Sequence, residues 1–401
     1  MNLFIKDLSY PENCNSLGVS ANYIKYFAQV HGHNVVKDII AAQYILLTSV
    51  HPIQSNSIKK YRKYKKPIIV GGSGCLSPHA YLQYADFVCV GDCNNVLINL
   101  NDKNKLVKLP NVLSKEKENE VIAVDDNFNF NIPPIMDEAG RYNLICGRGC
   151  KNKCFFCQTG WSLTYKESDK SIDANLLKQR GFKISYISND LSQHSFYKKM
   201  PVNTDGSYSI NHLKKTGLPI CREVRLGIEG VSERLRKFAN KPITKDDLVN
   251  CTIWLNNNKK SVRWFLIAGM PTETENDWQE LKESILEWKE RSIKGVLELS
   301  FTAFCPDPAT PFAYFGINSD YYDRFCDFKE WFFTGKGFSN RIKLYQCQQP
   351  KSLFEKAQYS MCISSDELKK NGYKSPNFNI LYPFKKQCDN IKRRFTKYNG
   401  S

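Results

Sequence analysis

The stretch Cys146-Gly-Arg-Gly-Cys150-Lys-Asn-Lys-Cys154-Phe-Phe-Cys157 follows an apolar, strand-like segment at residues 142–146. It spaces Cys150, Cys154 and Cys157 as C-x3-C-x2-C within eight residues. Soft thiolate ligands suit iron–sulfur clusters, and three of them can hold three irons of a [4Fe–4S] cubane. The fourth iron then stays open for a cofactor or substrate. A zinc site is the alternative, because Cys146 could supply a fourth ligand.

Beyond these cysteines, short apolar segments alternate with longer amphipathic ones. We expect strands at 142–146, 183–187, 223–228, 262–267 and 297–302, with helices such as 246–256 and 275–291 between some of them. Strands that alternate with helices indicate a parallel sheet. The pattern predicts a partial (β/α)6 TIM-type barrel over residues 138–315, with its site at the C-terminal ends of the strands.

The first hundred residues form a second α/β pattern. Strands are expected at 2–5, 44–50, 67–70 and 86–90, and helices at 21–31 and 55–64. These short apolar strands predict a parallel, doubly wound sheet over residues 1–100. Residues 101–137 are polar and irregular, which is typical of a linker or an extended wrap. Residues 316–401 are rich in aromatic and then basic residues, and we treat them as a C-terminal extension.

The composition limits the setting of the protein. The N-terminal segment MNLFIKDLSY has an early acidic residue and no long apolar run, so we expect no signal peptide and no membrane span. The chain has 15 cysteines, an odd number that argues against a secreted disulfide scaffold. A cytoplasmic protein that binds a metal or a cluster is therefore predicted.

The charge balance suggests a polyanionic partner. Lysine and arginine number 57 against 40 aspartates and glutamates, which gives a formal net charge of +17. The basic residues concentrate at 59–66, 103–108 and 385–397. Such surfaces favour phosphate backbones, so a nucleic acid is a candidate partner and substrate. Lysine-rich solvated faces are the alternative interpretation.

The cysteine segment resembles the signature of the radical S-adenosylmethionine (SAM) superfamily, which has an aromatic residue, here Phe156, before the third cysteine. The form RGCxxxCxFC resembles the branch with an N-terminal cobalamin-binding-type domain and the related methylthiotransferases. The resemblance implies that the open iron binds SAM. It also implies that an external electron donor of the flavodoxin or ferredoxin type drives SAM cleavage to a 5'-deoxyadenosyl radical.

Three later segments strengthen the resemblance. LGIEGVSERLR (226–236) is similar to a fourth-strand turn of the family, and Lys241 lies twelve residues beyond Glu229. FLIAGMPTET (265–274) is similar to a fifth-strand element that beds the adenine, although Phe265 stands where relatives often carry aspartate. SFTAFCPDPATP (300–311) resembles a sixth-strand segment. The SAM contacts implied by the resemblance are Phe156, Ser188, Asn189, Glu229, Lys241, Ile267 and Gly269.

Ser188 and Asn189 enter that set by position, since they end the second expected strand, where the family presents polar groups to the SAM amino group. Capping of a following helix by Asn189 or Asp190 is an equally open interpretation.

The N-terminal pattern resembles the flavodoxin-like domain of the cobalamin-type branch. IIVGGSG (68–74) and ADFVCVGD (85–92) carry this similarity. The D-x-H-x-x-G motif that supplies a cobalt ligand is absent, which leaves cobalamin binding undecided. Candidate contacts with cobalamin or substrate are His51, Gly71 and Gly72, although a turn role is the alternative for His51.

Methylthiotransferases carry three further cysteines in this domain. Cys14 and Cys75 fall at suitable places, but the third position, near Ser49, lacks cysteine. The remaining cysteines Cys305, Cys326, Cys347 and Cys362 have no ligand spacing and are expected to be buried thiols.

We therefore expect a radical SAM enzyme that modifies a substrate carbon, with a DNA or tRNA base as the favoured substrate and methylation or isomerisation as the outcome. The alternatives are a peptide- or protein-modifying radical SAM methyltransferase and a tRNA methylthiotransferase-like enzyme. A non-enzymatic iron–sulfur or zinc module that binds nucleic acid is the alternative of a different class.

Overall fold

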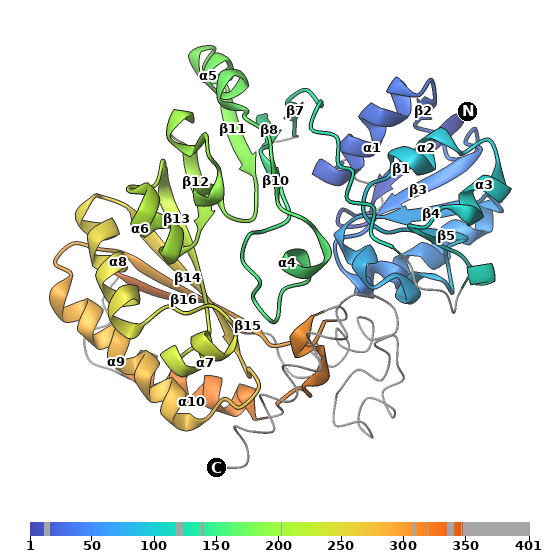
Figure 1. The fold of residues 1–401 in the computed structure, drawn as a ribbon. Helices are drawn as coiled ribbons and strands as arrows, with labels where there is room; N and C mark the ends of the chain where they lie inside the picture. Colours follow the sequence, from blue (N-terminus) through green and yellow to red (C-terminus); the bar gives the residue numbers. More distant parts are fainter. Residues whose placement is uncertain are drawn as a thin grey trace.

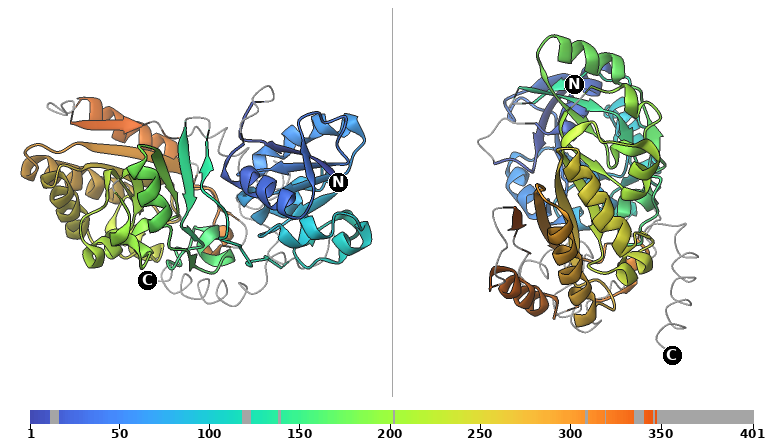
Figure 2. Two further views of the ribbon diagram at one scale, coloured as in Figure 1. Left: turned by 90° about the horizontal axis from the view of Figure 1, so that it is seen from above. Right: turned by 90° about the vertical axis from the view of Figure 1, so that its left-hand side faces the viewer.

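A computed structural model describes residues 1–11, 17–117, 123–137, 140–201, 203–307, 310–318, 320–334, 341–345 and 347. Figure 1 shows two α/β units, an N-terminal unit and a second unit, residues 135–345, which we call the barrel unit after the partial barrel that the sequence predicts. In the view from above in Figure 2, the two units again lie side by side.

The N-terminal unit is built on one six-stranded sheet. Its strand order is β2-β1-β3-β4-β5-β6, and every pair is parallel except β5 with β6. The order 2-1-3-4-5 is that of flavodoxin-like folds, so the predicted doubly wound sheet is confirmed. The strands are β1 (Asn2–Asp7), β2 (Asn34–Val36), β3 (Tyr44–Thr48), β4 (Ile68–Gly71), β5 (Phe87–Cys89) and β6 (Val112–Leu113).

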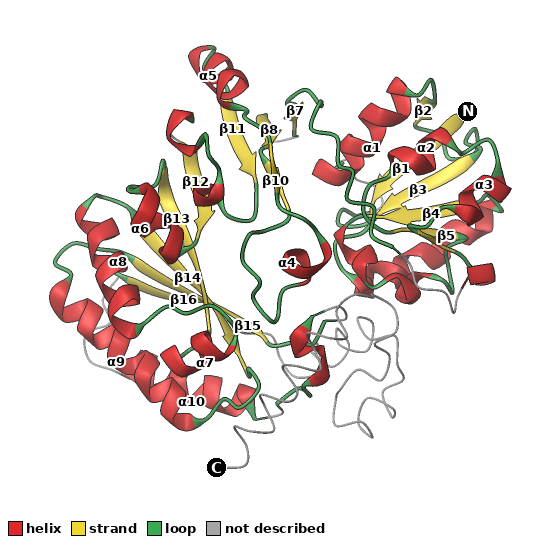
Figure 3. Cartoon of the chain, in the orientation of Figure 1, coloured by secondary structure: helices red, strands yellow, loops and turns green. Residues whose placement is uncertain are grey.

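Helices cover both faces of this sheet (Figure 3). They are α1 (Val19–Val30), the 3-10 helices η1 (Pro52–Tyr64), η2 (Ser73–Leu76), η3 (Pro78–Tyr81) and η4 (Lys115–Lys117), α2 (Asn94–Ile98) and α3 (Lys103–Lys108). All five residues of strand β3 are buried, so both faces of the sheet are covered by helices at this strand. Leu46 packs into the core with Phe27 of α1, and Leu47 packs on the opposite face with Ile58 of η1.

Within the described residues, the barrel unit contains seven parallel strands in two sheets. One sheet has the order β11-β8-β7, in which β7 is antiparallel, and the other has the parallel order β12-β13-β14-β15-β16. A separate ladder pairs β9 with β10. The strands are β7 (Ile135–Met136), β8 (Arg141–Ile145), β9 (Gly147–Arg148), β10 (Lys166–Glu167), β11 (Lys183–Ile187), β12 (Asn203–Tyr208), β13 (Cys221–Glu229), β14 (Ser261–Ala268), β15 (Leu297–Ala303) and β16 (Ile342–Tyr345).

The helices of the barrel unit are α4 (Gln158–Ser162), α5 (Ser171–Gln179), η5 (Leu191–Gln193), η6 (Tyr197–Lys199), α6 (Ile210–Thr216), α7 (Glu233–Phe238), α8 (Lys245–Asn257), α9 (Glu275–Arg291), η7 (Pro311–Tyr314) and α10 (Tyr321–Thr334). Helices such as α5, α8 and α9 lie along the outer side of the strands, whereas α4 lies between the two units (Figure 3). The alternation of strand and helix confirms the predicted α/β class. Helix α10 and strand β16 continue it into the segment that the sequence interpretation treated as an extension.

Alternation along β14 separates the core from the interior of the barrel. Trp264 and Leu266 are buried and belong to the main core with Trp278 and Trp288 of α9. The intervening residues Arg263, Phe265 and Ile267 are less buried and face the other way. At the N-terminal end of this inner face, Arg263 pairs with Glu298 of β15, and Lys343 of β16 lies 3.2 Å from the same carboxylate. This charged layer lies away from the C-terminal ends of the strands.

Among the described residues, no helix combines the length and the apolar character that a bilayer span requires.

Candidate radical SAM site

The three signature cysteines lie on one loop, residues 149–165, which we call the cluster loop. Its two ends are joined by the β9–β10 ladder, in which Gly147 pairs with Glu167 and Arg148 with Lys166. Figure 1 places this loop, with α4, between the two units. Gly149 has a φ of +72°, and a Cβ there would lie 2.4 Å from the Thr164 carbonyl oxygen, so the loop closes only with glycine at this position.

Backbone contacts fix the middle of the cluster loop against the mouth of the barrel. The Phe155 amide donates to the Ala239 carbonyl at 3.0 Å, and its carbonyl accepts from the Phe312 amide at 2.9 Å. The Asn240 side chain donates to the Lys153 carbonyl at 2.8 Å. Phe156, the predicted SAM contact, is half-buried and packs against the main core. The loop is therefore held at the C-terminal ends of the strands, where the sequence predicts the site.

The cysteines themselves are partly or fully buried and carry no disulfide. Cys154 is buried, and Cys150 and Cys157 are partly exposed. Burial raises the pKa of the Cys154 thiol to about 12 and also raises the pKa of the Cys157 thiol. The nearby Cys150 sulfur adds to the rise in both pKa values. Such thiols lose their protons readily only beside a cation or a metal. Three thiols on one closed loop fit the donor set of a cubane with one open iron.

Among the described residues, no three His, Cys, Asp or Glu side chains converge closely enough to hold a single metal ion. A cubane binds its cysteines at separate corners, so its ligands need not converge on one point. Cys146, the candidate fourth zinc ligand, is fully buried in the main core, and its thiol donates to the Leu144 carbonyl at 3.3 Å.

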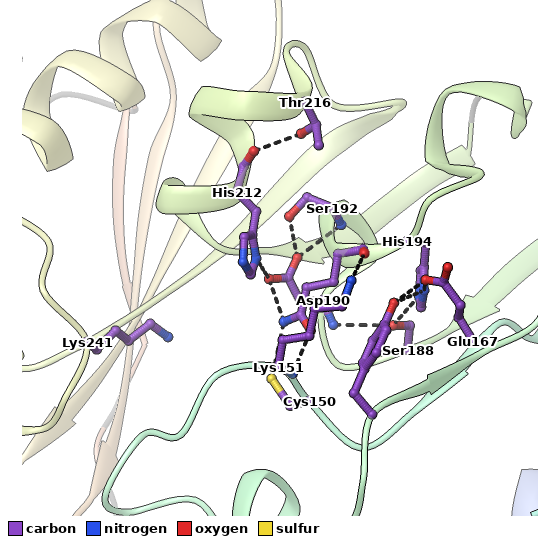
Figure 4. Close-up of polar contacts among 12 residues, drawn as sticks. Cys150, Lys151, Glu167, Ser188, Asp190, Ser192, His194, His212, Thr216 and Lys241 are labelled. Atoms are coloured by element: carbon purple, nitrogen blue, oxygen red, sulfur yellow. Dashed lines mark hydrogen bonds and ion pairs between the residues drawn. The ribbon is translucent and has the colours of Figure 1, made fainter.

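Polar side chains after β11 contact the first cysteine. Gln193 donates through Nε2 to the Cys150 sulfur at 3.2 Å and to Asp190 at 3.0 Å, and its Oε1 accepts from the Lys151 amide at 2.8 Å. Asn189, a predicted SAM contact, donates to the Gly149 carbonyl at 3.0 Å. Both side chains thus position the start of the cluster loop. Figure 4 shows the arrangement around Asp190.

Asp190 caps η5, as the alternative interpretation suggested, because its carboxylate accepts from the Ser192 amide at 3.0 Å. It also lies 2.8 Å from Nδ1 of His212. Burial would raise the pKa of Asp190, but hydrogen bonds from His212, Ser192 and Gln193 outweigh it and lower that pKa. Asp190 is therefore an ionised, buried carboxylate beside the cluster loop.

Glu229 and Lys241 form an ion pair at the end of β13, with 3.0 Å between Nζ and Oε1. Glu229 has a φ of +71° at a β-bulge, which turns its side chain toward Lys241. Burial would lower the pKa of Lys241, but the charges of Glu229 and Cys154 outweigh it and raise that pKa. The structure thus brings both predicted SAM-binding residues next to a cluster cysteine.

The fifth-strand element is held by a buried carboxylate. Glu273 accepts from the Gly269 amide at 2.8 Å, from the Met270 amide at 3.2 Å and from the Trp278 indole at 2.9 Å. Gly269 has a φ of +77°, and a Cβ there would lie 2.6 Å from Tyr321. Ile267 lies two residues earlier on the inner face of β14. The amide of Gly269 is therefore engaged within the chain, which leaves the half-buried Ile267 as the apolar surface of this element.

A cavity of about 240 Å³ opens between the two units. Its walls come from α1, from the ends of β4 and β5, and from the base of the cluster loop. Lining residues include Tyr23, Gly71, Gly72, Cys89, Asp92 and Arg148. The cavity lies at the carboxyl edge of a flavodoxin-like sheet, which is where such sheets bind ligands. Gly72 has a φ of +102°, and a Cβ there would lie 2.4 Å from the Ser49 carbonyl oxygen.

Arg148 brings charge to this cavity from the cluster loop side. Its Nη1 lies 3.9 Å from Asp92, and within the described part of the chain that buried atom has no hydrogen-bond partner. Asp92 accepts from the Tyr23 hydroxyl at 2.8 Å, and burial raises the pKa of its carboxyl. The guanidinium also lies 4.8 Å from the ring centre of Phe128. Arg148 can therefore donate to an acceptor group on a ligand in the cavity.

His51 and the additional cysteines singled out from the sequence have other positions in the structure. His51 is absent from the residues that line this cavity, and its Nδ1 accepts from the Ile53 amide at 3.2 Å, so it caps η1. Of the methylthiotransferase-type positions, Cys75 and Ser49 are buried and Cys14 lies outside the described residues. Cys305 and Cys347 are buried as expected, Cys326 is exposed instead because α10 turns it outward, and Cys362 is not described.

The basic runs are not concentrated at the cavity. Lys66 follows η1 and donates to the Ile40 carbonyl at 2.8 Å, which places the end of the 59–66 run at the amino edge of the sheet. Residues 103–108 form α3, and residues 385–397 lie outside the described residues.

Sequence reasoning missed several residues that the structure gathers around the cluster loop. They are Tyr23, Asp92, Arg148, Tyr165, Glu167, Gln193, His194 and His212. Arg148 could have been found, because it stands inside the quoted cysteine segment. Tyr165, Glu167, Gln193 and His194 come together through the β9–β10 and β11–β8 pairings. Tyr23 and Asp92 meet where α1 packs beside the end of β5, and His212 reaches Asp190 from α6. No local sequence pattern indicates these meetings.

Comparison with known proteins finds distant relatives of this chain. No protein-family model matches the chain. The chain is 24% identical over 298 residues to the uncharacterised protein MJ0966 of Methanocaldococcus jannaschii, covering 64% of this chain and 65% of that protein. It is 23% identical over 299 residues to the ribosomal protein uS12 methylthiotransferase RimO of Clostridium kluyveri, covering 63% and 66%. The chain thus spans slightly less than two thirds of these relatives.

Two solved structures share the fold. The cobalamin-dependent SAM radical enzyme OxsB, solved with aqua-cobalamin and SAM, matches with a TM-score of 0.60 and 14% identity, covering 94% of this chain and 63% of that one. The radical SAM methyltransferase TsrM of Kitasatospora setae, solved with cobalamin and a [4Fe–4S] cluster, matches with a TM-score of 0.56 and 12% identity, covering 75% and 74%. At these identities the two likenesses show a shared fold, and it is the fold that the resemblance to the radical SAM superfamily implies.

Proposed function

We propose that this member of the radical SAM superfamily is a transferase-type enzyme that cleaves SAM reductively and modifies a carbon atom of its substrate. The observation that carries the proposal is the juxtaposition at the barrel mouth. The loop that bears Cys150, Cys154 and Cys157 lies next to the Glu229–Lys241 pair, and Lys241 is close enough to Cys154 for their charges to interact. A [4Fe–4S] cluster held by the three cysteines would supply the electron that splits SAM.

The chain's own residues would bind and orient SAM. Lys241 is a partly buried cation that can pair with the methionine carboxylate, and Glu229 can accept from the amino group or the ribose. Ile267 offers an apolar surface for the adenine. Because these side chains are only partly exposed, SAM bound over them would displace water and strengthen each contact, and the 5' carbon could be held near the substrate carbon.

The cavity between the units is the proposed cobalamin pocket. Its place at the carboxyl edge of the flavodoxin-like sheet supports this, and so do OxsB and TsrM, which were solved with cobalamin. Arg148 and Asp92 would contact its polar side groups, and Gly71 and Gly72 would allow a close approach of the backbone. With cobalamin bound, methyl transfer to carbon is the expected outcome, and otherwise a rearrangement such as isomerisation is expected.

For the substrate we propose a nucleic-acid base. The net charge of +17 supports a polyanionic partner. A peptide or amino-acid substrate is the second candidate, because the relative RimO is named for a ribosomal protein and TsrM was also solved with tryptophan. The position of the 59–66 run away from the cavity favours this second candidate.

Spectroscopy of the reconstituted protein tests the proposal. The chain is loaded anaerobically with iron and sulfide and reduced with dithionite, and its electron paramagnetic resonance spectrum is recorded with and without SAM. We expect a reduced-cluster signal that SAM changes in wild type and that is absent from the Cys150→Ala, Cys154→Ala, Cys157→Ala triple variant. A signal that SAM leaves unchanged would contradict the assignment of SAM to the open iron.

The substrate class is tested separately. Steep weakening of binding to tRNA or single-stranded DNA with rising salt, together with SAM-dependent labelling of the polynucleotide, would support a nucleic acid. Labelling confined to peptides or free amino acids would favour the second candidate.

A further inference from the structure

A buried glutamine contacts the first cysteine of the cluster loop. Gln193 is the last residue of η5, and its side-chain nitrogen Nε2 lies 3.2 Å from the Cys150 sulfur and 3.0 Å from the Asp190 carboxylate. Its side-chain oxygen Oε1 lies 2.8 Å from the backbone nitrogen of Lys151. Both ends of this amide are therefore engaged, and one of its partners is the sulfur of a predicted cluster ligand.

These partners determine which end of the amide faces the sulfur. A backbone N–H can only donate, so the atom that meets the Lys151 amide is the carbonyl oxygen of Gln193. The NH2 group then supplies one N–H to the Asp190 carboxylate and the other to the Cys150 sulfur. The reverse orientation would bring the amide oxygen against the carboxylate and N–H groups against the backbone N–H. The contacts thus assign Gln193 as a donor to the sulfur.

Gln193 is held from its backbone as well as from its side chain. Nζ of Lys151 donates to the Gln193 carbonyl at 2.8 Å, in addition to the contact between the Lys151 amide and Oε1. The residue that follows Cys150 therefore binds Gln193 at two points. Only 6% of the surface of Gln193 is exposed, so its amide is removed from solvent. The N–H donor is consequently preorganised at the sulfur.

Asp190 anchors the amide from the other side. One of its carboxylate oxygens accepts from the Ser192 amide at 3.0 Å, and the other lies 2.8 Å from Nδ1 of His212. Figure 4 shows Asp190 next to His212, Ser192 and the start of the cluster loop. Because this carboxylate is itself fixed by η5 and α6, the first N–H of Gln193 has a constant partner. The second N–H is thereby directed to Cys150.

An N–H donor at a cysteine sulfur affects the redox properties of the cluster that this sulfur would hold. A thiolate ligand carries negative charge, and a hydrogen bond to a charged acceptor stabilises that charge. Reduction adds one electron and so increases the negative charge on the cluster and its sulfur ligands. The hydrogen bond therefore stabilises the reduced state more than the oxidised state, which raises the reduction potential.

We propose that Gln193 is a positioning residue that raises the reduction potential of the cluster through its hydrogen bond to the Cys150 sulfur. The inference rests on the proposed function and extends it, because reductive cleavage of SAM requires one electron from an external donor of the flavodoxin or ferredoxin type. That electron reduces the cluster and then passes to the sulfonium, whose bond to the 5' carbon breaks to give methionine and the 5'-deoxyadenosyl radical. Gln193 makes the uptake of the electron more favourable.

Redox titration of the reconstituted protein, followed by electron paramagnetic resonance without SAM, tests the inference independently of turnover. Gln193→Met keeps a similar side-chain length and removes both N–H donors. We expect its midpoint potential to be lower than that of wild type. Loss of a hydrogen bond to a charged group should lower the ratio of reduced to oxidised cluster at a given potential about 10-fold, which is about 59 mV for one electron.

A second variant and a second signature support the reading of this shift. Gln193→Asn keeps the amide but is one methylene shorter, so it should lose the contact with sulfur and lower the potential in the same direction. Electron–nuclear double resonance of the reduced cluster in H2O and in D2O detects exchangeable protons near the cluster. Wild type should show one coupled exchangeable proton more than Gln193→Met.

Asn256→Leu is the matched control. Asn256 is also a buried amide of the barrel unit with three hydrogen bonds, which it donates to the Lys260 and Val296 carbonyls and accepts from the Trp288 indole. It lies near the end of α8, just before β14 begins, and therefore at the opposite ends of the strands from the cluster loop. Its loss should lower stability and leave the midpoint potential at the wild-type value.

The outcomes separate the inference from the proposed function. A wild-type midpoint potential in fully loaded Gln193→Met, or an equal shift in Asn256→Leu, would overturn the inference and leave the proposed function intact. If Gln193→Met assembles no cluster, Gln193→Asn decides by the same criterion. Loss of the cluster from both, with Asn256→Leu fully loaded, would show a structural role instead and would also overturn it. If wild type itself assembles no [4Fe–4S] cluster, the proposed function fails first and the inference fails with it.

Discussion

The ammonium of Lys241 lies 3.0 Å from the Glu229 carboxylate, and Gly227 is the residue that leaves room for both. A Cβ at position 227 would lie 2.6 Å from Glu229 Oε1 and 2.8 Å from Lys241 Nζ. The two charged groups are thus confined between β13 and the cluster loop. A single methyl group on the strand would displace them.

The Gly227→Ala variant should therefore weaken SAM binding more than it destabilises the fold. The displaced atoms are the ends of long side chains, so we expect a loss of folding stability of about 1 kcal/mol. SAM affinity should fall about 10-fold, because the displaced Glu229 and Lys241 side chains can no longer contact the methionine portion of SAM in the geometry of the wild-type protein. Isothermal titration and thermal unfolding of the same preparation measure both effects. If Gly227→Ala bound SAM with wild-type affinity while its melting temperature was lowered, the assignment of Glu229 and Lys241 to SAM binding would be wrong.

The pH dependence of stability should reveal Glu167. Its folded pKa of about 2 lies below its ordinary value of 4.5, so the ionised form stabilises the fold. That contribution is complete above about pH 4.5 and is lost as the pH falls toward 2. The stability difference between wild type and Glu167→Gln should be constant from about pH 7 to 5 and should shrink below that. Urea midpoints measured across this range test it, and a difference that does not change with pH would contradict the assignment.

Arg148 should control binding in the cavity between the units. We expect Arg148→Met, which keeps the length and removes the charge, to weaken hydroxocobalamin binding about 10-fold, since the Nη1 donor faces the cavity without a hydrogen-bond partner among the described residues. Equilibrium dialysis with absorbance detection measures it. Lys105→Met on the exposed helix α3 is the control and should bind as wild type. Equal hydroxocobalamin affinity of wild type, Arg148→Met and Lys105→Met would contradict a role of Arg148 in cobalamin binding.

Gly91 follows β5 in the N-terminal unit and forms a β-bridge with Asp125, in the segment that leads to the barrel unit. It has a φ of +93°, and a Cβ there would lie 2.1 Å from the Asp125 carbonyl oxygen. Gly91→Ala should cost about 3 kcal/mol or more, from backbone strain and a backbone clash together. Gly32→Ala is the matched control, because Gly32 also has a positive φ, +75°, but a Cβ there would meet nothing within 4 Å, and about 1 kcal/mol is expected. Similar melting temperatures for the two variants would contradict the close approach.

Much of the fold followed from the sequence because apolar periodicity is a local signal. The strand expected at 183–187 and the helix expected at 275–291 occur with the same bounds as β11 and α9. Strand β12 was missed because its sequence, NTDGSY, has no apolar alternation, and it is held by pairing with β13. Strand β16 was missed because a short strand at the edge of a sheet gives little pattern of its own.

The site was predictable to the extent that its residues share a local motif. Cys150, Cys154 and Cys157 stand in one segment, and Glu229 and Lys241 follow at family-like separations. By contrast, Tyr165, Glu167, Ser188 and His194 are hydrogen-bonded to one another because β10 returns beside β9 and because η5 turns back after β11. Such meetings depend on tertiary structure, so the spacing of these residues in the sequence does not reveal them.

The measurement that tests the central claim most directly is SAM cleavage by the cluster-loaded protein. The chain is reconstituted anaerobically with iron and sulfide, SAM and dithionite are added, and 5'-deoxyadenosine and methionine are quantified by mass spectrometry, with and without cobalamin. We predict both products from wild type and neither from the Cys150→Ala, Cys154→Ala, Cys157→Ala triple variant. A fully loaded wild-type cluster that yields no 5'-deoxyadenosine, with cobalamin, tRNA, DNA or peptide substrates present, would contradict the account.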